Sequence, residues 1–585
     1  MDAQQFLAEF GHIANAPGGV GKLREMVYQL AITGTLTSQL DTDGDAHELL
    51  ADISKLREKL IREKAYKRQT KLEAEALNIP SAIRLPATWC WTRLLDLGEI
   101  SPRNDAPDEA DASFIPMSGF SEFHMGALVP EAEKWGHIKK GFTHFRNGDV
   151  VVAKITPCFE NGKAAVIDGL QHGIGAGTTE LHIFRPIHPG ILPRYIYLFL
   201  RSPYFALEGE KNMTGTAGQK RLPTEYFATR ALPLPPSTEQ ARIVAKVDEL
   251  MALCDKLETQ QQARRKLQNK LRQSTLQAVA TATSPHELQT TWARLADNFG
   301  RLFHAPEDVD DFVVELKNMA VRGLLSLPSS SSSHLDQVIA DCDNLRDHYI
   351  TSGLMRRQKL ITVAESDVVY PEHWATAPFD KVAVVIGGVT KGRDMRGRDV
   401  VTCPYLAVAN VQRGFFKLTD LKTIQIGKDE LNKYLVKEGD LLITEGGDWD
   451  KVGRTAIWRG AVENCLHQNH VFKARVPSSC LLNEWVELVF NSGVGRDYFA
   501  GASKQTTNLA SINMTQLRSF PMPIPPLEEQ RVILEKLDAL MALAGSWREK
   551  LERKQSLASL FAGATVAAFT GITVQQEEEP MKAPQ

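Results

Sequence analysis

Two long segments of the chain carry apolar residues at alternating spacings of three and four positions. The first follows the pair Pro235-Pro236 and the second follows Pro525-Pro526. Proline is excluded from the interior of a helix, so each pair predicts a helix that begins directly after it. The rhythm is typical of a coiled-coil seam or of a core helix, and both remain open. Its positions are Ile243, Val247, Leu250, Cys254 and Leu257 in the first segment, and Ile533, Leu537, Leu540, Ala544, Trp547 and Leu551 in the second.

The stretches of about 86–232 and 373–522 have a different pattern. Each contains a Gly-Asp turn followed by a short aliphatic or β-branched run, which is Val150–Ala153 in one stretch and Leu441–Thr444 in the other. Runs of this kind after turn residues predict β-strands. Polar, glycine-bearing loops interrupt both stretches, so we expect two strand-rich globular domains.

The two halves of the chain repeat one another. The segment Leu232–Gln240 recurs as Met522–Gln530, and the helical residues after each copy stay in phase. Shorter pairs recur in the same order, between 285 and 291 residues apart, among them Pro86–Trp89 with Pro371–Trp374 and Asn147–Val151 with Glu438–Leu442. The same order at nearly one spacing indicates a tandem duplication. Each copy holds an amphipathic helical opening, a strand-rich stretch and a long closing helix, which predicts an α+β fold.

The composition is that of an ordinary globular protein. Of 585 residues, 43% are hydrophobic and 24% are charged, and the formal net charge of −3 excludes a uniformly basic protein. Locally, residues 86–232 carry a net charge of −1 and residues 373–525 a net charge of +4. The seven cysteines are scattered without a C-x-x-C pair, which favours reduced thiols over a zinc site or disulfides. No signal peptide and no membrane-spanning apolar run are expected.

Sequence motifs for catalysis are absent. Ala16–Leu23 is similar to a phosphate-binding loop but lacks its first glycine and its closing Ser/Thr, so we interpret it as a glycine-rich helix entry. The chain has no N-P-P-Y or D-P-P-Y sequence of amino-methyltransferases, no G-x-S-x-G and no H-E-x-x-H. His467 and His470 have no matching Cys or carboxylate set, which favours polar strand or loop histidines over metal ligands. We therefore expect a non-catalytic chain without a metal.

The duplicated Pro-rich element resembles that of the DNA specificity (S) subunit of type I restriction-modification systems. The residues that carry the resemblance are Leu232–Leu253 with the second copy Met522–Leu543, Gly148–Lys163 and Leu23–Gly34. The resemblance covers essentially the whole chain. It implies a tandem duplication of a mixed α/β target recognition domain on long antiparallel coiled-coil-like helices, with pseudo-twofold symmetry. The implied parts are N-terminal conserved helices 1–85, recognition domain 86–235, a central helical spacer 236–372 with a Ser-rich linker at Ser329–Ser333, recognition domain 373–525, a C-terminal conserved helix 526–576 and an acidic tail 577–585.

By this resemblance the chain is the non-catalytic recognition subunit of a bacterial defence complex. Each recognition domain would read one half of a bipartite, asymmetric site in double-stranded DNA. The helices would act as rulers and would dock two modification (methyltransferase) subunits for adenine methylation, and restriction (translocase/endonuclease) subunits would complete the complex. S-adenosylmethionine, ATP and Mg²⁺ would bind to those partners and not to this chain. The complex would lie in the bacterial cytoplasm, without contact to a membrane.

Polar and basic loop residues are the candidate DNA contacts, because Arg and Lys bind phosphates and Arg, Asn and Gln pair with base edges. They are Lys154, Asn161, Lys163, Gln219, Lys220 and Arg221 in the first domain, and Lys391, Arg393, Arg396, Arg398, Lys451, Arg454, Lys504 and Gln505 in the second. The scaffold signals repeat between the domains but these residues do not, as expected for readers of different sequences. The candidate subunit-docking positions on the helices are Ile243, Val247, Leu250, Leu257, Ile533, Leu537, Leu540 and Leu551.

Two other classes of function remain open. A scaffold protein would use the long helices to join other proteins without touching DNA, but two strand-rich domains with divergent polar loops argue against that class. A self-sufficient methyltransferase or nuclease would need the motifs that the sequence lacks.

Overall fold

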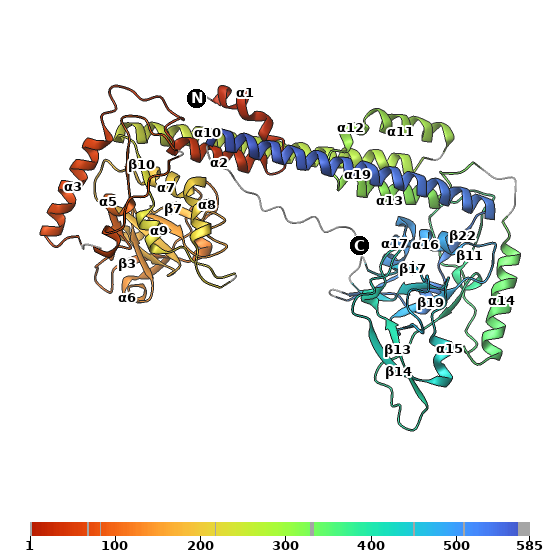
Figure 1. Cartoon of the computed structure of the whole chain (residues 1–585). Helices are drawn as coiled ribbons and strands as arrows, with labels where there is room; N and C mark the ends of the chain where they lie inside the picture. The colour runs from red at the N-terminus through yellow and green to blue at the C-terminus, as the bar shows by residue number, and fades with distance from the viewer. Residues whose placement is uncertain are drawn as a thin grey trace. The chain divides into compact units, whose positions relative to one another are not determined.

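The computed structural model describes residues 3–66, 70–81, 83–216, 218–282, 284–327, 333–447, 451–506 and 509–570 (Figure 1). The chain forms two compact units, one built from residues 1–265 with 554–585 and the other from residues 266–553. Among the described residues, no helix combines the length and the apolar character that a membrane crossing requires. Residues 329–332 of the predicted Ser-rich linker and the predicted acidic tail 577–585 lie outside the described ranges.

Each half of the chain closes with one long helix, as the sequence predicts. Helix α10 spans Ser237–Ala280 and helix α19 spans Leu527–Thr570. Each begins at the first residue after its proline pair, because proline supplies no backbone N–H and its ring clashes with a preceding helical turn. Helix α10 begins in the first unit and ends in the second, and helix α19 does the reverse. Each unit therefore contains parts of both helices.

The apolar faces of both helices pack into the cores of the units. Ile243 and Val247 are fully buried in the core of the first unit, and Ile533 is fully buried in the core of the second. The far ends are buried as well, with Ala562 and Val566 of α19 in the first unit and Leu276, Val279 and Ala280 of α10 in the second. The apolar rhythm in the sequence therefore marks the inward face of each helix, which packs against a domain near the helix start and, at Ala544 and Leu551 of α19, against other helices.

The helical segment before each domain is also duplicated. The first unit has α1 (Ala3–Ala14), α2 (Gly19–Ile32) and α3 (Ala46–Arg62). The second has α11 (Pro285–Asp297), α12 (Phe299–Leu302), α13 (Asp308–Val321) and α14 (Leu335–Thr351). Helix α2 begins at Gly19, which confirms the predicted helix entry. A Cβ atom at Gly19 would lie 1.8 Å from the carbonyl oxygen of Ile13, so only glycine fits there.

The first strand-rich domain contains two four-stranded sheets. One has the antiparallel order β2-β9-β6-β7, and the other has the order β4-β3-β8-β5, in which β3 and β8 are parallel. A separate antiparallel pair joins β1 (Cys90–Thr92), near the start of the domain, to β10 (Leu232–Leu234), which lies just before α10 in the chain. The other strands are β2 Gly98–Ile100, β3 Asp111–Ile115, β4 Glu131–Lys134, β5 Thr143–Arg146, β6 Val150–Ala153, β7 Ala164–Val166, β8 Ile174–Gly177 and β9 Leu181–Pro186. Helices α7 (Pro193–Arg201), α8 (Pro203–Asn212) and α9 (Thr224–Thr229) complete the domain.

The second domain repeats the order of the first sheet, and its second sheet repeats three of the four strands of its counterpart. Its sheets have the orders β12-β19-β15-β17 and β14-β13-β18, with β13 and β18 parallel, and β11 pairs with β22 before α19. Figure 1 shows β13 and β14 extending away from the body of the domain and α14 along its side. The strands are β11 Ala375–Pro378, β12 Val384–Ile386, β13 Val400–Leu406, β14 Lys422–Gly427, β15 Leu441–Thr444, β17 Thr455–Ile457, β18 Leu466–His467, β19 Val471–Arg475 and β22 Pro521–Ile524. A small sheet of β16 (Gly446–Gly447), β21 (Leu509–Ser511) and β20 (Lys504–Thr506) is added, with helices α15 (Leu431–Tyr434), α16 (Asn483–Asn491), α17 (Gly493–Ala502) and α18 (Met514–Arg518). The predicted α+β fold with two mixed-sheet domains and long helices is confirmed.

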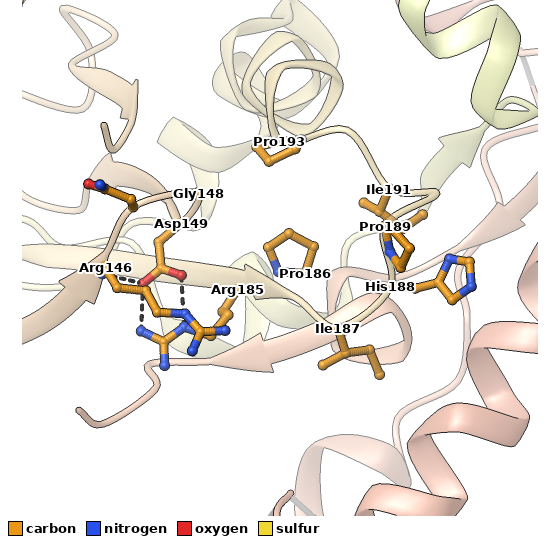
Figure 2. Close-up of a pocket in the computed structure, with 11 residues that line it drawn as sticks. Arg146, Gly148, Asp149, Arg185, Pro186, Ile187, His188, Pro189, Ile191 and Pro193 are labelled. Carbon is orange, nitrogen blue, oxygen red and sulfur yellow. Dashed lines mark hydrogen bonds and ion pairs between the residues drawn. The ribbon is translucent and has the colours of Figure 1, made fainter. Parts of the chain in front are cut away.

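The aspartate of each Gly-Asp turn forms a buried ion pair. Both oxygens of Asp149, whose side chain is 1% exposed, accept hydrogen bonds of 2.8 Å from the Arg185 guanidinium (Figure 2). Asp149 also accepts the backbone N–H of Arg146 at 2.8 Å, which closes the turn before β6. Asp440 and Arg475 make the same two-oxygen pair at 2.6 Å in the second domain. In each domain the pair joins a turn to the neighbouring strand: the turn before β6 to β9 in the first domain, and the turn before β15 to β19 in the second.

The Glu-Gln pair at the start of each long helix is buried and bonded. Glu239 accepts from the Trp89 ring nitrogen at 2.8 Å and from the side chains of Thr37 and Gln39 at 3.0 and 2.8 Å. Gln240 accepts the Leu192 amide at 2.9 Å. In the second copy, Glu529 bonds to Ser326 at 2.6 Å and His373 at 2.8 Å, and Gln530 accepts the Leu482 amide at 2.9 Å. Each pair therefore ties a helix start to its domain and to the helical segment before that domain.

We expect Asp149→Asn to destabilise the first unit by about 3 kcal/mol, because the buried Arg185 charge loses its nearest counter-ion and keeps only the more distant Glu99, 3.9 Å away. Urea unfolding followed by tryptophan fluorescence measures the loss. The matched control is Asp394→Asn, which removes the partner of Arg396, a side chain that is 92% exposed. The control should leave the unfolding midpoint unchanged, since exposed pairs contribute little. Equal midpoints for both variants would contradict the structural role of the buried pair.

Candidate nucleic-acid interface

The candidate contacts that follow the Gly-Asp strands occupy equivalent places in the two domains. The amide of Lys154 donates to the carbonyl of Glu180, and the Lys154 carbonyl accepts the amide of Leu222. In the second domain, Glu445 makes the two equivalent backbone bonds. Its amide donates to the carbonyl of His470, and its carbonyl accepts the amide of Ile512. The backbone frame is therefore the same, while the side chains on it are different.

In the first domain, three of the candidate residues bond to other parts of the domain through their side chains. Arg221 makes a two-pronged ion pair with Glu180 at 2.9 and 2.8 Å, which lowers the pKa of that carboxyl. The Asn161 side chain donates to Glu122 at 3.0 Å, and the Lys163 ammonium donates to the Met117 carbonyl at 3.2 Å. Gln219, Lys220 and Arg221 are exposed together on the segment that pairs back toward Ile155.

In the second domain the corresponding residues lie on β-structure and its loops. Arg454 donates to the Gln412 side chain at 2.8 Å, and both Arg454 and Lys451 are half-buried. Lys504 and Gln505 belong to β20, which pairs with β21, but their side chains lie outside the described part of the structure. The segments before the closing strands therefore differ between the domains, since the described residues of the first form isolated bridges where the second has a three-stranded sheet.

The basic loop before β13 contains Lys391, Arg393, Arg396 and Arg398, and each arginine has a carboxylate partner. Arg393 binds both oxygens of Glu430 at 3.0 and 2.8 Å. Arg398 binds Asp429 at 2.9 Å, and Arg396 binds Asp394 at 2.8 Å. Lys391 lies over the Tyr405 ring, 5.1 Å from its centroid. The loop borders a pocket of about 610 Å³ between Thr390 and Gln425, and its positive charge is largely balanced by its own neighbours.

Those acidic partners are the residues that the sequence did not reveal. Glu430 lies 37 residues after Arg393 and Glu180 lies 41 residues before Arg221, and no spacing rule connects them. Hydrogen bonding to Arg393 lowers the pKa of the Glu430 carboxyl, so it stays ionised and holds the guanidinium in place. Only the tertiary fold brings these side chains together.

The two histidines that the sequence places three residues apart, His467 and His470, have separate surroundings. His467 is fully buried in β18, and one ring nitrogen bonds to the Val471 carbonyl at 2.7 Å. Burial lowers its pKa to about 3, so its ring is neutral. His470 is exposed and lies 2.9 Å from a Glu445 oxygen. Within the described ranges, no group of three or more His, Cys, Asp or Glu is arranged to hold a metal ion.

The candidate docking positions face the interior of the chain. Ile243, Val247, Leu250 and Ile533 have no solvent exposure, Leu537 and Leu551 are buried, and Leu257 and Leu540 are half-buried. Other apolar residues of the same helices are exposed, namely Leu267 and Leu271 of α10 and Leu543, Leu557, Leu560 and Phe561 of α19. A partner that docks on these helices would meet the second set and not the first.

Comparison with known proteins identifies the two domains. Residues 86–264 and 371–553, together more than half of the chain, match the family described as "Type I restriction modification DNA specificity domain". The chain is 30% identical to the type I restriction enzyme EcoEI specificity subunit of Escherichia coli over 549 residues, which cover 92% of this chain and 91% of that protein. It is 32% identical to the Escherichia coli EcoAI specificity subunit over 538 residues, 89% of each chain.

A solved structure, that of the HsdS subunit from Thermoanaerobacter tengcongensis, is 18% identical, with 84% of this chain and 97% of that chain covered and a TM-score of 0.39. The family match spans both copies of the duplication, and the two Escherichia coli relatives are matched over nearly their whole lengths. The chain therefore belongs to the type I restriction-modification DNA specificity subunits, the non-catalytic components of these systems, and carries two target recognition domains.

Proposed function

We propose that this chain reads a bipartite, asymmetric site in double-stranded DNA, with one recognition domain for each half-site. The observation that supports this function is the duplicated backbone frame with different side chains on it. Two equivalent frames suit two segments of one duplex, and different side chains suit different base sequences. The proposed contacts are Lys154, Asn161, Lys163, Gln219, Lys220 and Arg221 for one half-site, and Lys391, Arg393, Arg396, Arg398, Lys451, Arg454, Lys504 and Gln505 for the other.

The same proposal assigns the other activities of the complex to its partners. Two modification subunits would dock on this chain and methylate adenines, and restriction subunits would join them to cleave DNA. S-adenosylmethionine, ATP and Mg²⁺ would bind to those subunits, in the bacterial cytoplasm. The exposed apolar residues Leu267, Leu557 and Leu560 of the long helices are suited to docking, because exposed apolar groups become more stable when a partner covers them. Residues 86–235 and 373–525 are the proposed recognition domains, and 1–85, 236–372 and 526–576 are the proposed helical parts.

The function is tested on the complex of this chain with its modification subunits. Methylome sequencing of bacteria that express the complex should yield one sequence with two specified halves and an unspecified gap. Gel-shift titration with that duplex should give tighter binding than with a scrambled duplex at the same salt concentration. A complex without preference for any bipartite sequence would overturn the proposal and would favour a scaffold role.

We expect Glu430→Gln to make DNA binding more dependent on salt, because it removes the carboxylate that competes with phosphate for the Arg393 guanidinium. Each added phosphate contact steepens the plot of log K against log salt by about 0.9. Fluorescence anisotropy of the complex at several salt concentrations measures the slope. The control is Glu484→Gln, which frees Arg459, an exposed arginine outside the basic loop, and should leave the slope unchanged. If Glu430→Gln and Arg396→Ala both left the slope unaltered, the loop would not contact DNA.

We also expect the lengths of the long helices to set the gap between half-sites. Because both helices run from one unit into the other, the insertion is made in both, after Arg265 in α10 and after Arg553 in α19. Four helical residues add about 6 Å, which corresponds to about two base pairs. Methylome sequencing should show a longer gap with unchanged bases in each half. Changed half-site bases with an unchanged gap would contradict the ruler role.

A further inference from the structure

One loop in each recognition domain presents an exposed phenylalanine. The first is the loop of residues 120–130, which runs from a single 3-10 turn at Met117–Gly119 to β4. The second is the loop of residues 411–421, which runs from a 3-10 turn at Val408–Asn410 to β14. Both loops begin after a strand at the same place in the duplicated topology and have the same length. Phe123 is 76% exposed in the first and Phe415 is 60% exposed in the second.

Hydrogen bonds hold the loop in the first domain directly after the exposed ring. His124, the residue after Phe123, bonds to the Tyr28 hydroxyl at 3.0 Å and to Asp248 at 3.1 Å. The amide of Met125 donates to the Tyr197 hydroxyl at 3.1 Å. Four of the five residues that make these bonds are buried or half-buried, so the bonds are shielded from water. The ring of Phe123 is therefore presented by a fixed backbone.

A different set of bonds holds the loop in the second domain. Gly414 adopts φ +83°, a conformation that favours glycine, and its amide donates to the Thr455 carbonyl at 3.0 Å. The amide of Gln412 donates to the Phe415 carbonyl at 3.0 Å and closes the tip. Asn410 and Lys417 exchange two bonds of 2.8 Å at the base of the loop. Both loops are fixed, although the residues that fix them are unrelated.

Both loops are also joined to residues that are candidate DNA contacts. Glu122, next to Phe123, accepts the side-chain amide of Asn161 at 3.0 Å. Gln412, at the tip that carries Phe415, accepts the guanidinium of Arg454 at 2.8 Å. Single exposed apolar residues are ordinary on protein surfaces. An exposed aromatic ring at the same place in both domains, on a rigid loop and beside a base-reading candidate, requires a common explanation.

We propose that Phe123 and Phe415 insert at a base step of the DNA, one ring in each half-site, and this inference depends on the proposed function. Apolar side chains that enter between base pairs unstack them and kink the duplex. A rigid loop suits this task, because the ring loses little conformational freedom when it binds. The step that yields most easily is a pyrimidine–purine step, so the two rings add sequence preference through DNA deformability.

The surroundings of the two rings favour DNA over a protein partner. Phe123 lies between Glu122 and His124, whereas Phe415 lies between Gly414 and Phe416, with Arg413 and Lys417 nearby in the loop. Two copies of the same modification subunit would need the same surface twice, and these surfaces share only the ring. Two half-sites of different sequence need only the ring in common, because stacking on a base tolerates any sequence.

The test uses the complex with its modification subunits and the duplex whose half-sites the methylome defines. A 2-aminopurine base is placed at successive positions, and its fluorescence rises where a neighbouring base is unstacked. We expect Phe123→Ala to remove the signal at one step of one half-site and Phe415→Ala to remove it at one step of the other. Each variant should bind the duplex on the order of 10-fold more weakly, equivalent to about 1.4 kcal/mol.

Matched variants separate the outcomes of this test. Phe123→Trp and Phe415→Trp should keep the signal and the affinity, and Leu360→Ala, which removes a side chain that is 87% exposed outside both loops, should change neither. Unchanged fluorescence and affinity in both alanine variants would overturn the inference, as would their failure to assemble with the modification subunits, since that result would assign the rings to a protein interface. If the unaltered complex had no preferred site, the proposed function itself would fail instead.

Discussion

A glutamate that is buried at the start of a helix must find hydrogen-bond donors, and in this protein the donors of Glu239 come from two distant parts of the chain, residues 37–39 and Trp89. Unpaired carboxylates are costly in the interior, so Glu239 is stable only when Trp89, Thr37 and Gln39 surround it. Its neighbour Gln240 closes the set by binding the Leu192 amide. The start of the long helix, the first strand of the domain and the helical segment before the domain are held at one point. The second copy does the same with Glu529 and Gln530.

This arrangement explains how one scaffold can serve two readers. The buried pairs at the helix starts and at the Gly-Asp turns are the same in both domains, and they fix the strand order and the position of the loops. None of them involves the side chains of the reading loops. The exposed residues on the frame can therefore differ, as Lys154 and Glu445 do at one equivalent place, without loss of the fold. Divergent specificity on a common frame follows from that separation of roles.

The candidate site was only partly predictable from the sequence. Loop residues with the right chemistry could be selected by their type and by their place after the Gly-Asp turns, and the backbone bonds put Lys154 and Glu445 at equivalent positions. The charge balance of the basic loop could not be foreseen, since the carboxylate that pairs with Arg393 belongs to Glu430, which lies 37 residues later in the chain. The candidate docking positions lie on the inward faces of the two long helices, because the apolar rhythm marks the face that packs inward. No sequence pattern indicated that Phe123 and Phe415 are exposed, since a phenylalanine is more often part of a core.

The sequence by itself determined the duplication, the starts of both long helices, the strands after the Gly-Asp turns and the family. Those features follow from local rules: proline excludes a helix interior, apolar spacing defines a face, and a repeated order of residues marks a repeated unit. Tertiary structure alone decided which carboxylate pairs with which arginine, which face of each helix is covered, and that each long helix contributes to both units. These outcomes depend on contacts between residues that are tens to hundreds of positions apart, and no local pattern encodes the partner of a buried charge.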